Sequence, residues 1–147
     1  MIAVLQRIKS ASVIADGEPF SSCERGFLVL LGVSFEDDEQ DARLLADKIS
    51  KLRVFTDSED KMNLSLIDTD GELLVISQFT LYADCKSRRP GFTGAARPET
   101  AIPLYEKFMS ECRDRGFQVE HGEFGADMQV FSQNDGPVTI LLDTDTL

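Results

Sequence analysis

The chain has 147 residues, of which 42% are hydrophobic and 28% are charged, as is typical of one globular domain. Its formal net charge of −11 argues against general nucleic-acid binding, because phosphate contacts require Lys and Arg. Three scattered cysteines and one histidine predict neither a disulfide framework nor a His/Cys metal site. No apolar run reaches membrane-spanning length, and the N-terminus lacks a signal-peptide pattern. We therefore expect a cytoplasmic protein without cofactor, metal, membrane or DNA partner.

Strands dominate the first third of the chain. Residues 1–9 alternate in polarity as a strand does, residues 12–15 begin another strand, and Asp16-Gly17 then predicts a hairpin turn. Residues 26–33 are continuously apolar, which is typical of a strand buried on both faces. Residues 37–52 start with acidic caps and place their leucines on one face, which predicts the first helix.

The middle of the chain alternates short strands with turns. Residues 53–55 begin a strand, and residues 61–66 follow a polar turn. Residues 73–82 are predicted to form a strand whose apolar start changes to polar residues. Residues 83–96 are the longest irregular segment, and a loop of this length in a compact domain is usually functional or mobile.

The C-terminal third contains the second helix, over residues 100–115, with Pro103 expected in its first turn. Short strands are predicted at residues 118–120 and 127–131, with His121 interpreted as a loop residue. Many strands with two segregated helices predict an α+β fold.

The last strand is entered through Gly136-Pro137, after the turn formers Asn134 and Asp135. Proline suits the first position of a strand, glycine adopts angles closed to other residues, and a cis bond is accessible only before proline. On local sequence alone, this is either an ordinary turn or a rigid bend with outward-facing carbonyls. Residues 143–147 follow as a polar tail that we expect to fray.

Two stretches together identify a family. Ser77-Gln78-Phe79-Thr80-Leu81 and Asn134-Asp135-Gly136-Pro137-Val138-Thr139 resemble the two signature motifs of the D-aminoacyl-tRNA deacylases. Further segments resemble that family in its own order and extend the likeness over nearly the whole chain: residues 3–7, 11–13, 28–33, 61–64, 89–90, 94–98 and 124–128. The resemblance implies one deacylase-like domain over residues 1–147, with mixed, barrel-like β-sheets and two main helices.

The resemblance also implies an activity. Members hydrolyse the ester of D-aminoacyl-tRNA to free tRNA and D-amino acid, and reject L-aminoacyl-tRNA, which is chiral proofreading in translation; glycyl-tRNA also fits such a filter. By resemblance Gly136-Pro137 is cis, forms the chirality filter and enters the partner subunit's active site, so that a homodimer is required. Arg7 is carried over as a gate residue beside it. Supporting positions are Met128, Asn134, Val138 and Thr139.

The ester is already activated, so water, geometry and stabilisation of an oxyanion suffice for its hydrolysis. Backbone N–H groups near Phe79 and Thr80 are suitable oxyanion donors. Thr80 is alternatively a nucleophile, but its hydroxyl then needs an activating base. Ser77 and Gln78 either position the terminal adenosine or make ordinary strand hydrogen bonds.

A tRNA enzyme of this net charge must concentrate its cations locally. Lys86, Arg88, Arg89 and Arg97 lie in one short span with Asp84 as the only acidic residue among them, and we predict that they contact tRNA. The alternative is a solvated surface loop.

Two other functions stay open. One is a sister deacylase with a relaxed filter for a mischarged L-amino acid, and the other is a non-catalytic binding module on the same scaffold. Phe131-Ser132-Gln133 departs from the family, whose members usually carry small and aliphatic residues there, and we expect it to alter the packing behind Gly136-Pro137.

Overall fold

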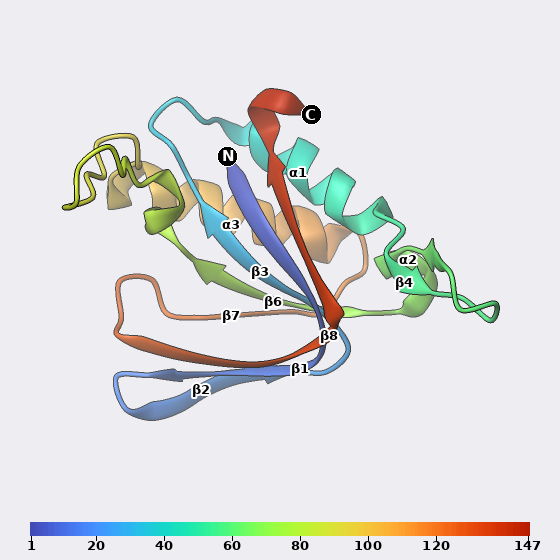
Figure 1. Cartoon of the computed structure of the whole chain (residues 1–147). Helices are drawn as coiled ribbons and strands as arrows, with labels where there is room; N and C mark the ends of the chain where they lie inside the picture. The colour runs from blue at the N-terminus through green and yellow to red at the C-terminus, as the bar shows by residue number, and fades with distance from the viewer.

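Two long strands form the spine of the fold. The computed structural model covers residues 1–147, and in it β1 (Ile2–Ala15) pairs antiparallel with β8 (Met128–Asp143) over almost its whole length. Both strands bend sharply midway, and the bend carries them from one layer of the sheet to the other (Figure 1). Each was predicted as two separate strands. That prediction was wrong, because pairing between β1 and β8 continues through the irregular residues.

One six-stranded sheet, in the order β2-β1-β3-β6-β7 with β8 on β1, curls into a nearly closed barrel. Its remaining strands are β2 (Glu18–Cys23), β3 (Gly26–Gly32), β6 (Glu72–Ser77) and β7 (Val119–His121). A separate hairpin contains β4 (Phe55–Thr56) and β5 (Met62–Leu64). The predicted α+β, barrel-like architecture is confirmed, and His121 lies in β7 rather than in a loop.

The central strands β3 and β6 are parallel and buried on both faces, as the continuous apolar run predicted. Phe27 and Val29 of β3 point into a large core beneath the helices, whereas Leu28 points into a smaller core closed by the second halves of β1 and β2. Two cores on opposite faces explain why these strands lack polar alternation.

Helices cover one face of the sheet (Figure 1). They are α1 (Glu39–Lys51), α2 (Leu66–Thr69) and α3 (Pro98–Asp114). A capping box between Asp38 and Asp41 starts α1, and Pro98 occupies the first position of α3. The two main helices are confirmed and α2 is a short third. Pro103 lies inside α3, beyond the first turn where we predicted it.

Two further predictions fail for tertiary reasons. The strand predicted over residues 73–82 ends at Ser77, and the chain then forms the 3-10 helix η1 (Phe79–Tyr82). The C-terminal tail forms the 3-10 helix η2 (Thr144–Thr146) instead of fraying. Thr144 is buried, and its Oγ1 accepts a hydrogen bond from the N-terminal amine of Met1 at 2.8 Å. No helix in the structure combines the length and the apolar character needed to cross a membrane.

Candidate active site

The Gly-Pro motif forms a protruding bulge in β8. Gln6 pairs with Thr139 and Ile8 pairs with Asn134, so that residues 135–138 of β8 stand opposite the single residue Arg7 of β1. Four residues against one cannot lie in the sheet plane, and they loop outward. We call residues 135–138 the elbow. Its Gly136–Pro137 bond is cis, as the resemblance implied, and both residues are exposed.

The side chain of Asn134 closes the base of the elbow. Its Oδ1 accepts a hydrogen bond from the backbone N–H of Val138 at 2.9 Å, and its Nδ2 donates to Thr139 Oγ1 at 3.2 Å. These two contacts span the elbow and hold its ends together, and a supporting role of the three residues in catalysis stays a prediction.

Arg7 anchors the elbow from below. Its side chain is buried, and it donates from Nε to the Asp135 carbonyl at 2.9 Å and from Nη1 to the Val54 carbonyl at 2.6 Å. Gly136 has a φ of +136°, and a Cβ added there would lie 2.9 Å from Arg7 Nη2. Only glycine fits this backbone angle and this approach. The predicted neighbourhood of Arg7 and Gly136-Pro137 is therefore confirmed, whereas a gating role stays a prediction.

The second motif lies where β6 ends. The backbone N–H of Gln78 donates to the Leu31 carbonyl at 2.8 Å, which turns the chain into η1. Phe79 and Thr80 begin this helix, so their N–H groups have no acceptor within it. The Thr80 hydroxyl accepts a hydrogen bond from the Gln78 side-chain amide. An amide is not a general base, so this contact does not activate Thr80 as a nucleophile.

A hollow of about 310 Å³ opens beside the second motif, and we call it the η1 hollow. Ser77, Gln78 and Phe79 line one side, and Met128 lines another. Phe79 is 53% exposed and contacts Phe92 edge-on at a centroid distance of 5.0 Å. The residues of the loop before β8 complete the wall and were not predicted as site residues, although they lie in a segment that carries the family resemblance: Phe124, Gly125 and Ala126.

The elbow lies far from the η1 hollow of its own chain. Arg7, opposite the elbow, pairs through β3 with Leu73, four residues before Ser77. The sheet order places three strand steps between β8 and β6. The four residues correspond to about 13 Å along the strands, and the three strand steps to about 14 Å across them. In Figure 1 the bend of β8 is accordingly at the right and the end of β6 at the left.

All four predicted tRNA-binding cations are exposed, on the segment that follows η1: Lys86, Arg88, Arg89 and Arg97. Asp84 lies 3.9 Å from Lys86 across open solvent, so this ion pair neutralises little of the charge. A bridge between Asp84 and Gly91 closes the loop that carries the first three cations. The base of this loop adjoins the η1 hollow, because Phe92, next to Gly91, contacts Phe79.

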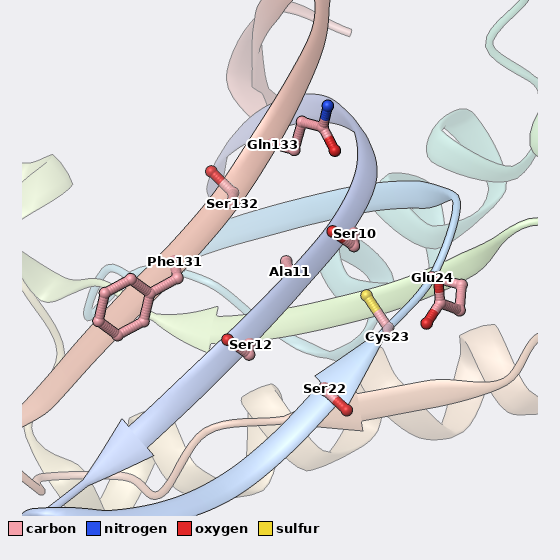
Figure 2. Close-up of a pocket in the computed structure, with 9 residues that line it drawn as sticks. All are labelled: Ser10, Ala11, Ser12, Ser22, Cys23, Glu24, Phe131, Ser132 and Gln133. Atoms are coloured by element: carbon pink, nitrogen blue, oxygen red, sulfur yellow. The ribbon is translucent and has the colours of Figure 1, made fainter.

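We expected Phe131-Ser132-Gln133 to alter the packing behind the elbow, but these residues do not pack there. All three residues are exposed, and they line a shallow hollow with Ser10 and Cys23 over β1, β2 and β8 (Figure 2). Burial, with Glu72 nearby, raises the pKa of the Cys23 thiol to about 12, so this thiol is protonated at neutral pH. The hollow contains no activated nucleophile. Elsewhere in the chain, no three His, Cys, Asp or Glu side chains converge as a metal site.

Comparison with known proteins assigns this arrangement to a family. The family model described as D-Tyr-tRNA(Tyr) deacylase matches residues 4–143. The chain belongs to the D-aminoacyl-tRNA deacylase family. A D-aminoacyl-tRNA deacylase of Thermosipho africanus is 53% identical over 98% of this chain and 97% of its own length, and that of Thermus aquaticus is 54% identical over 98% and 95%.

Solved structures agree with the assignment of the fold. A protein described as c-Myc DNA Unwinding Element Binding Protein is 43% identical, with a TM-score of 0.92 over 97% of this chain and 98% of the other. A probable eukaryotic D-amino acid tRNA deacylase shares the fold at 16% identity, with a TM-score of 0.80 over 96% and 97%. As a member of the deacylase family, the chain is a hydrolase acting on ester bonds, with aminoacyl-tRNA as the substrate that the family supports.

Proposed function

We propose that this deacylase hydrolyses D-aminoacyl-tRNA, and glycyl-tRNA as an achiral substrate, while it rejects L-aminoacyl-tRNA. The observation that carries the proposal is the presence of both halves of a site on exposed surfaces. One half is the 77–80 motif with unpaired N–H groups beside a hollow. The other is the rigid, glycine-containing elbow, which stands clear of its own sheet.

The chemistry runs through the backbone. Water attacks the ester carbonyl carbon, and the N–H groups of Phe79 and Thr80 donate to the oxyanion that forms. The bond between the carbonyl carbon and the ribose oxygen then breaks, and the ribose oxygen takes the proton that the water loses, assisted by the neighbouring ribose hydroxyl. Gln78 fixes the Thr80 side chain through its amide, and Ser77 lines the hollow for the terminal adenosine.

The two halves come from different subunits of a homodimer. Within one chain they lie three strand steps and four residues apart. A two-fold pair brings each elbow into the other chain's η1 hollow and makes two equivalent sites. Sedimentation at micromolar concentration is expected to give a dimer, and a fully active monomer would contradict the arrangement.

Handedness is read by fixed main-chain groups of the elbow. Outward carbonyls of Gly136 and Pro137 bind the α-amino group of a D-residue and clash with the substituents of an L-residue. Arg7 and Asn134 hold these carbonyls in place through contacts on both sides of the elbow. Because the filter touches only the amino-acid backbone, the side chain is free to vary.

The deciding experiment compares hydrolysis of D-tyrosyl-tRNA and L-tyrosyl-tRNA by the pure protein, with glycyl-tRNA as a third substrate. We expect turnover of the D-ester and the glycyl ester and none of the L-ester. Turnover of the L-ester at a similar rate would identify a sister deacylase with a relaxed filter. Binding of tRNA without turnover of any ester would identify a non-catalytic binding module.

A further inference from the structure

A third hollow lies against the elbow, on the side away from the chain's own 77–80 motif. Its volume is about 360 Å³, and we call it the Arg25 hollow. Four separate parts of the chain meet there: the middle of β1, the turn before β3, the hairpin of β4 and the elbow itself. Its lining residues are Arg7, Lys9, Arg25, Phe55, Thr56 and Asp135.

The hollow is positive in a strongly negative protein. It contains three cations and one carboxylate, whereas the whole chain has 15 Lys and Arg against 26 Asp and Glu. The carboxylate of Asp135 is already directed at Arg7, with Oδ2 3.6 Å from Nε. Lys9 and Arg25 are exposed and make no ion pair or side-chain hydrogen bond. Two cations are thus left without an anionic partner.

The arrangement is partly preorganised for an anion. The Arg25 guanidinium lies 5.5 Å from the centroid of the Phe55 ring, and this contact restricts a side chain that is otherwise flexible. Arg7 is fixed by two backbone carbonyls. The N–H groups of Arg25 are not engaged, so its guanidinium is suited to the oxygens of a phosphate, which it binds through two parallel N–H groups. Arg7 adds positive charge, while its Nε and Nη1 already donate to carbonyls.

We propose that the Arg25 hollow binds the phosphodiester that joins the last two nucleotides of the aminoacyl-tRNA held in the partner subunit's site. This inference rests on the proposed function. Asp135 belongs both to the elbow and to the hollow, so when the elbow enters the partner's site the hollow accompanies it to the mouth of that site. The charged group of tRNA nearest to the ester is this phosphodiester.

The test is Lys9→Gln/Arg25→Gln, which removes both unpaired cations and leaves Arg7 in place. Lys48→Gln/Lys51→Gln on α1 is the control for net charge, because it removes two cations from exposed positions elsewhere, of which Lys51 pairs with Asp47 at 2.7 Å. Binding of tRNA that carries no amino acid is measured as a function of salt concentration. Hydrolysis is measured for D-tyrosyl-tRNA and for D-tyrosyl adenosine, which has no phosphate.

We expect the Lys9/Arg25 variant to bind tRNA at least about threefold more weakly, and the magnitude of its slope of log affinity against log salt to fall by about 0.7, the value for one lost phosphate contact. The control should change neither quantity. Hydrolysis of D-tyrosyl adenosine by the Lys9/Arg25 variant should equal that by the wild type. An unchanged salt slope, or an equal loss of activity on both substrates, would overturn the proposal.

Two other outcomes are distinguishable. If the variant loses affinity for inorganic phosphate alone and keeps wild-type tRNA binding, the hollow binds a free anion and its assignment to RNA is wrong. If the wild type hydrolyses neither ester, the proposed function fails, while the tRNA-binding comparison still decides whether the hollow contacts RNA.

Discussion

Gly136→Ala is the most direct test of the elbow. The added Cβ would lie 2.8 Å from Val138 Cγ2 and 2.9 Å from Arg7 Nη2, and both distances are shorter than ordinary carbon contacts allow. Arg7 cannot simply swing away, because its Nη1 is bonded to the Val54 carbonyl. The elbow must therefore shift. The φ of +136° adds about 1–3 kcal/mol of backbone strain for any residue with a side chain.

A shift of this size at the filter has a large catalytic effect. A misplacement of about 1 Å costs on the order of a hundredfold in rate, so a displacement of several tenths of an ångström should lower D-tyrosyl-tRNA hydrolysis by about tenfold or more. Affinity for tRNA that carries no amino acid should stay within about twofold of the wild type, since the proposed tRNA-binding cations are unchanged. Single-turnover hydrolysis of D- and L-tyrosyl-tRNA measures the effect.

Gly116→Ala is the matched control for this experiment. Gly116 also has a positive φ, +92°, but an added Cβ there meets nothing within 4 Å. It should lose only the stability that the backbone strain accounts for in thermal unfolding, and keep full activity and full rejection of the L-ester. If folded Gly136→Ala shows the same behaviour as this control, the elbow is only a turn and our assignment of the filter is wrong.

Three further predictions follow from the same contacts. Thr80→Ala should keep hydrolysis within about tenfold of wild type, because the oxyanion donors are backbone groups; a loss above about a thousandfold with normal tRNA binding would make Thr80 a nucleophile. Arg88→Gln/Arg89→Gln should lower the salt slope of tRNA binding by up to about 1.4, and an unchanged slope would place the RNA elsewhere. Burial raises the pKa of Cys23 and Cys112 to about 12, so iodoacetamide at pH 8 should label only the exposed Cys85, as read by mass spectrometry.

Local patterns predicted the elements better than their continuity. The alternation of β1 was visible on both sides of residues 10–11, but only pairing with β8 shows that one strand runs through them. Similarly, polar residues after Ile76 are compatible with a continuing strand. The strand β6 ends here because its partner β3 ends at Gly32. The backbone N–H of Gln78 donates to the Leu31 carbonyl, and the chain then turns into η1. Both features depend on partners distant in sequence, which no local pattern contains.

The site was predicted unevenly for the same reason. The two motifs were recognisable because each is a contiguous segment. The position of Arg7 beside Gly136-Pro137 was predicted from the family resemblance. The wall formed by Phe124 and the convergence of Lys9 with Arg25 were not predicted, because these residues meet only through the curl of the barrel. Thr144 looked like part of a loose tail, since nothing in its neighbours indicates that it binds the N-terminal amine.

The distribution of charge connects the proposals about RNA. A chain of net charge −11 repels the body of a tRNA, so attraction must come from places where cations gather. One such place is the loop after η1, beside the chain's own hollow, and the other is the Arg25 hollow, beside its elbow. In the proposed dimer the two places belong to different subunits but flank the same site. The acceptor end would then be attracted from both sides while the rest of the tRNA is not, which suits an enzyme that must sample many tRNAs and release each of them quickly.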